Sequence, residues 1–199
     1  MDGVLHIKPM TEAPGTETEV AMVFVDSYYN ELASISTNKE KLVRIFRPAF
    51  VKEAFYVAIM DGSVAGIMAC SDNAIRAIHI HKDDLTENLG LIKGNLAYKR
   101  LQEQYNIPIN YDDDTAYIES VATNPLLRRK GIATRLLEHV IRKLPYREFR
   151  LTVNDTNKDA LSIYEKLGFI EVDRMKAGFF ERKRFKYRIY MKLDKSYYI

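Results

Sequence analysis

The sequence contains a single cysteine, no tryptophan and no long apolar run. With Cys70 alone, no disulfide can form within the chain, and no cysteine–histidine spacing matches a zinc site. His79 and His81 share a face of an extended stretch, but two histidines without a third ligand do not predict a metal. No apolar run approaches the roughly 18 to 20 residues of a membrane span, and residues 1–10 lack the pattern of a signal peptide. We therefore expect a reducing, cytoplasmic setting, no metal and no membrane partner.

Excess charge of one sign is also missing, because 30 Lys and Arg residues face 27 Asp and Glu residues. A formal net charge of +3 is not typical of a domain that binds nucleic acid. The 199 residues contain no internal repeat and no linker rich in Gly, Ser or Pro. We expect one domain over residues 1–199 and no nucleic-acid partner.

The hydrophobic pattern predicts a mixed α/β chain. Its strongest local signal is a hairpin at residues 55–70, where two apolar segments flank Asp61-Gly62, a pair that accepts the positive φ angles of a tight turn. Thr156 and Asp159 have the spacing of a capping box at a helix start. Periodicity predicts further strands at 4–9, 116–123, 149–153, 169–175 and 184–193, and helices at 17–35, 38–47, 89–105, 131–144 and 157–167.

The segment 117–134, YIESVATNPLLRRKGIAT, places three cations directly before a glycine that opens a helix. A helix N-terminus presents unpaired N–H groups and a positive dipole end, so it attracts anions. Gly131 lets a phosphate approach the backbone, and Arg128, Arg129 and Lys130 add positive charge. A pyrophosphate site is one interpretation, and a solvated charge run beside a turn glycine is the other. The segment is neither a Walker P-loop nor a G-x-G-x-x-G fingerprint.

Two blocks of sequence carry a family resemblance. VATNPLLRRKGIATRLL resembles the acetyl-CoA motif of the GNAT superfamily of N-acetyltransferases, in which a strand leads to Arg/Gln-x-x-Gly-x-Gly/Ala and a helix. Arg128, Gly131 and Ala133 stand at the signature positions. LTVNDTNKDALSIYEKLGFIEV is similar to the family's second motif through Asn157, Ala160, Tyr164, Gly168 and Phe169. The resemblance covers about residues 117–172 and implies a GNAT-like fold: a mixed, mostly antiparallel sheet of about seven strands with helices on both faces.

The resemblance also implies acetyl-CoA as co-substrate and direct transfer of its acetyl group to an amine. In the family one strand splays from the next, and its free backbone groups pair with the pantetheine arm. Val121 and Thr123 stand at those positions, and the Val121 N–H stands where a donor polarises the thioester carbonyl. The residues that the resemblance places on the cofactor are Val121, Thr123, Arg128, Arg129, Lys130, Gly131, Ile132, Ala133, Thr134 and Asn157.

Two residues are expected to be catalytic. Tyr164 stands at the position of the family's proton donor, and a phenol with a pKa near 10 can share a proton with a thiol of pKa about 8.5. Without the resemblance, a core tyrosine is the commoner interpretation. Glu119 lies two residues before Val121 on the same strand and so shares its face, and we expect it to be the base. In many members of the family a Glu at this position reaches the amine through water. A surface carboxylate is the open alternative for Glu119.

The acceptor is not identified by any motif. We expect a small-molecule, peptide or protein amine, and the resemblance is compatible with a homodimer. The acidic run at 112–114 either attracts a cationic amine or is a solvated loop, and the basic cluster at 181–188 either meets an acidic partner or solubilises an edge strand. The alternative to an enzyme is a non-catalytic acyl-CoA-binding regulatory module, which would need neither Tyr164 nor Glu119. The presence of both residues favours the enzyme.

Overall fold

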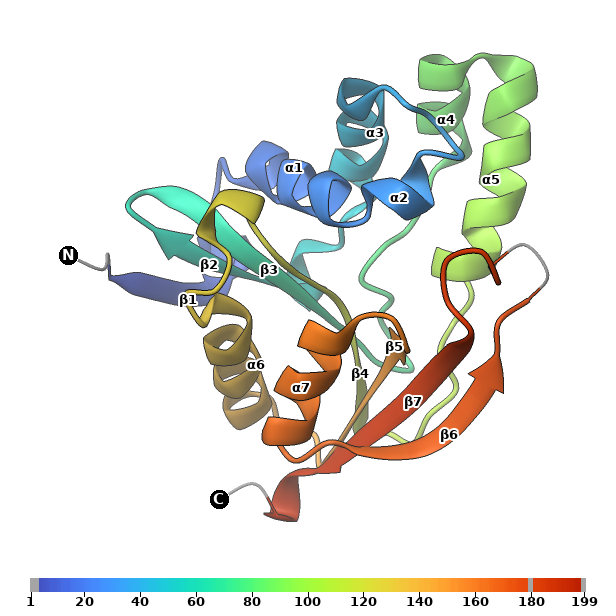
Figure 1. Cartoon of the computed structure of the whole chain (residues 1–199). Coiled ribbons are helices and arrows are strands. Elements are labelled where there is room, and N and C mark those ends of the chain that lie inside the picture. Colours follow the sequence, from blue (N-terminus) through green and yellow to red (C-terminus); the bar gives the residue numbers. More distant parts are fainter. Residues whose placement is uncertain (1–3, 179–180, 198–199) are drawn as a thin grey trace.

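The computed structural model describes residues 4–178 and 181–197, and its strands form one sheet in the order β1-β2-β3-β4-β5-β7-β6 (Figure 1). Only β4 and β5 pair in parallel, whereas the other neighbours are antiparallel. The predicted mixed, mostly antiparallel sheet is thereby confirmed, whereas the single-domain prediction extends beyond the described residues at both ends. The strands are β1 (Leu5–Pro9), β2 (Phe55–Met60), β3 (Ser63–Ser71), β4 (Thr115–Thr123), β5 (Glu148–Asn154), β6 (Ile170–Lys176) and β7 (Tyr187–Asp194).

Helices cover both faces of the sheet and create two hydrophobic cores (Figure 1). The first core lies between one face and α1 to α5, where Phe24 packs against Phe46 and Phe50 at ring distances of 5.0 and 5.3 Å. The second core lies on the opposite face under α6 and α7. The helices are α1 (Glu17–Ser27), α2 (Tyr29–Leu32), α3 (Lys39–Phe46), α4 (Lys82–Leu89), α5 (Leu91–Tyr105), α6 (Ile132–Lys143) and α7 (Lys158–Lys166).

The helices differ from the predictions at three places. The single helix predicted over 17–35 is interrupted at Tyr28, whose ring packs on Phe24 at 4.9 Å. α4 was not predicted, because its eight residues carry too few apolar side chains for a clear period. The capping box at Thr156 is wrong, because Asn157 caps α7 by accepting the N–H of Ala160 at 3.2 Å.

Candidate active site

The parallel strands β4 and β5 pair over only part of their length. Their paired residues run from Thr115 with Glu148 to Ile118 with Leu151, and no pairing follows among the described residues. Both strands nevertheless continue, β4 to Thr123 and β5 to Asn154. The facing backbone edges therefore separate in the middle of the sheet, and β4 keeps backbone groups that could pair with an extended ligand.

A β-bulge interrupts β4 at the same point. The pairing with β3 shifts by one residue between Ile67 opposite Ala122 and Ala69 opposite Glu119, and Ser120 has a φ of 56°. The extra residue reverses the alternation of side chains, so Val121 packs on the second core while Ala69, the partner of Glu119, belongs to the first. The expectation that Glu119 and Val121 share a face is therefore wrong.

The cationic loop leads from β4 to α6. Asn124 begins it with a side-chain cap on the N–H of Leu126 at 3.1 Å, and two left-handed residues end it, Arg129 at φ 64° and Gly131 at φ 71°. Arg128, Arg129 and Lys130 are exposed, and their side chains form no hydrogen bond or ion pair with any residue of the described ranges. Their charges are thus uncompensated where α6 begins, which suits an anionic ligand.

At the first turn of α6, the backbone at Gly131 is exposed, whereas the side chain of Ile132 is buried. A Cβ on Gly131 would meet open space, so its positive φ is what favours glycine here. Ile132 is 2% exposed and packs against Gly66, while Ala133 and Thr134 are half-buried. Ile132 therefore offers a ligand only its backbone. Asn157 lies at the start of α7, where its side-chain oxygen caps the helix and its amide N–H groups have no acceptor among the described residues.

Tyr164 projects from α7 into the second core, where its ring meets Phe169 edge to face at 5.8 Å. It is 8% exposed, and its hydroxyl has no hydrogen-bond partner among the described residues. Burial, followed by the nearby phenol of Tyr117, raises the pKa of Tyr164 above its usual value. The hydroxyl is therefore a protonated donor at neutral pH, as a general acid requires.

Glu119 lies on the face of the sheet opposite to Tyr164, and its carboxylate has two partners. Its Oε1 accepts a hydrogen bond from Ser71 Oγ, and Arg76 Nη2 lies 3.5 Å from its Oε2. The exposed fractions of the Arg76 and Glu119 side chains are 14% and 12%. The alternative of a simple surface carboxylate therefore does not describe Glu119.

Tyrosines surround this carboxylate. Tyr28 donates its hydroxyl to the carbonyl oxygen of Val121 at 3.3 Å, which links α1 to the bulge. Burial raises the pKa of Tyr28 and of Tyr105, with Glu119 a smaller cause for each. Burial also raises the pKa of Tyr117 to about 12, although its hydrogen bond to Thr152 at 2.9 Å opposes the shift. These phenols remain neutral over the ordinary pH range.

Sequence reasoning missed three residues of this site. Tyr28 lies within the helix predicted over 17–35, and nothing in the sequence indicates that its hydroxyl reaches β4. Ser71 and Arg76 lie at the end of β3 and in the segment that follows it, where no periodic pattern exists. Only the fold brings them to Glu119.

The described residues contain neither a metal-binding group nor a membrane-spanning helix. In residues 4–178 and 181–197, no group of three or more His, Cys, Asp or Glu side chains could hold a metal ion. Over the same ranges, no helix is both long enough and apolar enough to cross a membrane.

A sheet with a separated central pair of strands and a cationic loop at a helix start is the arrangement that the GNAT resemblance predicts. The family model of the acetyltransferase (GNAT) family matches residues 22–169, and the chain belongs to this family. No curated protein matches it in sequence.

Solved structures share the fold at low identity. An N-acetyltransferase from Staphylococcus aureus Mu50 has a TM-score of 0.59 and 20% identity, and the match covers 94% of this chain and 100% of that one. A GNAT-family acetyltransferase from Bacillus cereus has a TM-score of 0.58 and 12% identity over 96% and 98% of the two chains. The ribosomal-protein-S18-alanine N-acetyltransferase from Escherichia coli has a TM-score of 0.57 and 15% identity over 96% and 94%.

Proposed function

We propose that this protein transfers the acetyl group of acetyl-CoA directly to a primary amine of a small molecule, a peptide or a protein. The observation that carries the proposal is the separation of β4 from β5 after Ile118 and Leu151, beside the exposed loop that ends at Gly131. An extended pantetheine arm fits the free backbone of β4. A pyrophosphate fits the N–H groups and uncompensated cations of the loop.

The cofactor side is built mainly from backbone. Val121 and Thr123 would pair with the arm, and the N–H groups of residues 129–134 would hold the pyrophosphate together with the cationic side chains. Asn157 would donate its amide N–H groups toward the arm from the start of α7. When bound, acetyl-CoA supplies the acetyl group as a thioester.

Transfer needs a donor to the carbonyl oxygen, a proton for the departing sulfur and a base for the amine. The N–H of Val121 would stabilise the developing oxyanion, a contribution of roughly 3 kcal/mol for one well-placed donor. The amine attacks the carbonyl carbon, the C–S bond breaks, and Tyr164 gives its proton to the sulfur. Glu119 takes the proton that the amine loses. The family resemblance implies that a water molecule carries this proton, which suits a carboxylate that the bulge turns away from Val121.

The test is a calorimetric titration with acetyl-CoA, followed by thiol release with a panel of amines. The panel contains small primary amines, a polyamine and peptides, including one with an N-terminal alanine because one structural neighbour is named for that residue. Micromolar binding with amine-dependent thiol release supports the proposal.

Two other outcomes would contradict all or part of the proposed function. Binding without turnover on any amine favours the non-catalytic acyl-CoA-binding module. Absence of binding contradicts the cofactor site itself. A variant with Arg128, Arg129 and Lys130 all replaced by Gln is the matched control, since it removes the charges without touching either core.

A further inference from the structure

Glu119 meets two donors from one short segment, residues 71–77. Ser71 Oγ accepts the N–H of Ala77 at 2.9 Å, so the hydroxyl proton of Ser71 is directed at Glu119 Oε1. Arg76 approaches Oε2. Each carboxylate oxygen therefore has a donor, and donors of this kind stabilise and orient an ionised carboxylate.

Arg76 is itself held by the end of α5. Its Nη1 donates to the carbonyl oxygen of Ile107, and its Nη2 donates to that of Gln104 at 3.3 Å. Gln104 lies in the last turn of α5, where carbonyls lack partners within the helix. The guanidinium thus joins the segment after β3, the end of α5 and the carboxylate on β4. Its plane is fixed by contacts that do not involve Glu119.

Arg76 is the one cation paired with Glu119 in the described part of the chain. The other titratable groups near this carboxylate are Tyr28 between α1 and α2, Tyr105 from α5, Tyr117 from β4 and Cys70 from β3. Burial is the first cause that raises the pKa of each of these four groups, and they stay uncharged at neutral pH. Within residues 4–178 and 181–197, none of these groups can therefore replace the charge of Arg76.

We propose that Arg76 and Ser71 are positioning residues, which hold Glu119 as an oriented carboxylate so that it can accept the proton of the acceptor amine. The inference rests on the proposed function for the role of Glu119. The arrangement of the three side chains is independent of that role.

A split between kcat and KM separates positioning from a merely structural role. In Arg76→Gln and in Ser71→Ala we expect kcat at neutral pH to fall about tenfold. The KM for acetyl-CoA should not change. Arg174→Gln is the matched control, because Arg174 forms an exposed pair with Glu171 at 2.6 Å on β6, away from the site. A lowered melting temperature with an unchanged kcat would overturn the proposal.

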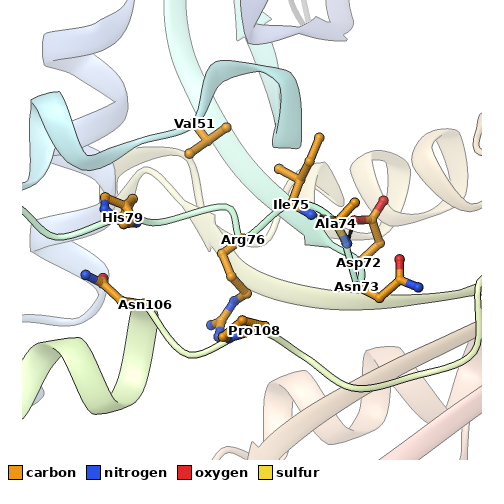
Figure 2. A pocket seen from close by; sticks show the side chains of 9 residues that line it. All are labelled: Val51, Asp72, Asn73, Ala74, Ile75, Arg76, His79, Asn106 and Pro108. Carbon is orange, nitrogen blue, oxygen red and sulfur yellow. Dashed lines mark hydrogen bonds between the residues drawn. The ribbon is translucent and has the colours of Figure 1, made fainter.

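Chemical rescue gives a second readout. Arg76 lines an open pocket of about 350 Å³ together with Asp72, His79 and Asn106 (Figure 2). In Arg76→Ala, the vacated space would admit a guanidinium ion from this pocket. We expect millimolar guanidinium to restore part of the lost rate, and sodium chloride at equal ionic strength to restore none. Equal effects of the two salts would contradict the role of the guanidinium group.

A third measurement does not depend on turnover. If the wild-type protein transfers no acetyl group, the proposed function fails, yet the contacts of Glu119 can still be tested. A double-mutant cycle of Arg76→Gln and Glu119→Gln should give a loss in melting temperature smaller than the sum of the single losses. Additive losses would show that the two side chains are not coupled and would overturn the inference on its own.

Discussion

Ile118 and Ala122 lie four residues apart on β4, yet they are buried in opposite hydrophobic cores. On a regular strand two residues four apart share one face. The bulge at Ser120 reverses the alternation between them. It turns Val121 to the α6–α7 side, where the cofactor is proposed to bind, and leaves Glu119 on the other side.

The bulge can be tested at Ser120. A φ of 56° is strained for a β-branched residue, so Ser120→Val should lower the free energy of unfolding by about 1 to 2 kcal/mol. Ser120→Gly should be tolerated, because glycine adopts this conformation freely. Urea unfolding measures both, and a Val variant as stable as the wild type would contradict the conformation.

A second prediction concerns the positive charge of the cationic loop between β4 and α6 and its effect on acetyl-CoA binding. Replacing Arg128, Arg129 and Lys130 by Gln should weaken acetyl-CoA binding at least about tenfold and flatten its dependence on salt, since three screened charges are lost. The control replaces Arg182, Lys183 and Arg184, which removes the same charge from another surface. Equal losses in the two triple variants would point to a general effect of net charge.

Tyr164→Phe isolates the proton donor. We expect kcat to fall about a hundredfold or more, with calorimetric affinity for acetyl-CoA unchanged. Because burial raises the pKa of Tyr164, the wild-type rate should show no basic limb from this phenol below about pH 10. Tyr98→Phe on α5 is the control. Full kcat in Tyr164→Phe would exclude the role.

Asp72 gives a prediction on stability and pH. Its Oδ1 accepts the N–H groups of Ala74 and Ile75, and its Oδ2 accepts the hydroxyl of Tyr146 at 2.6 Å. Burial works to raise the pKa of Asp72, but these hydrogen bonds, that of Tyr146 first, lower it below the usual value of 3.8. A carboxyl whose folded-state pKa is depressed adds stability above its unfolded-state pKa and loses it as the pH falls through the folded-state value.

Asp72→Asn should therefore cost about 1 kcal/mol at pH 7, and the difference from wild type should shrink below about pH 4. Thermal unfolding at pH 7 and at pH 3 measures it. A difference of the same size at both pH values would show that the charge of Asp72 is not involved.

The sequence predicted best the parts whose local signals agree with the fold. The hairpin around Asp61-Gly62 forms as expected, with a positive φ at both residues. The predicted helices at 131–144 and 157–167 match α6 and α7 to within a residue or so at each end. In these segments the apolar period and the turn residues indicate the same structure.

What escaped prediction depends on contacts between distant segments. Ser120 adopts a left-handed conformation without the glycine that usually marks a bulge. Arg76 stands alone in an aperiodic stretch, and only the approach of α5 and β4 gives it partners. Leu85 is the one fully buried residue of α4, too little for a recognisable helical period.

The division of β4 between two cores also has a consequence for engineering. Tyr28, directly after α1, and Tyr105, at the end of α5, interact electrostatically with Glu119, whereas the cationic loop and α6 pack on the opposite core. Under the proposed function, substitutions that reshape the first core would alter which amine fits while leaving the surface proposed for acetyl-CoA untouched. A library confined to α1, α2 and the end of α5 would therefore sample new acceptors without rebuilding the donor side.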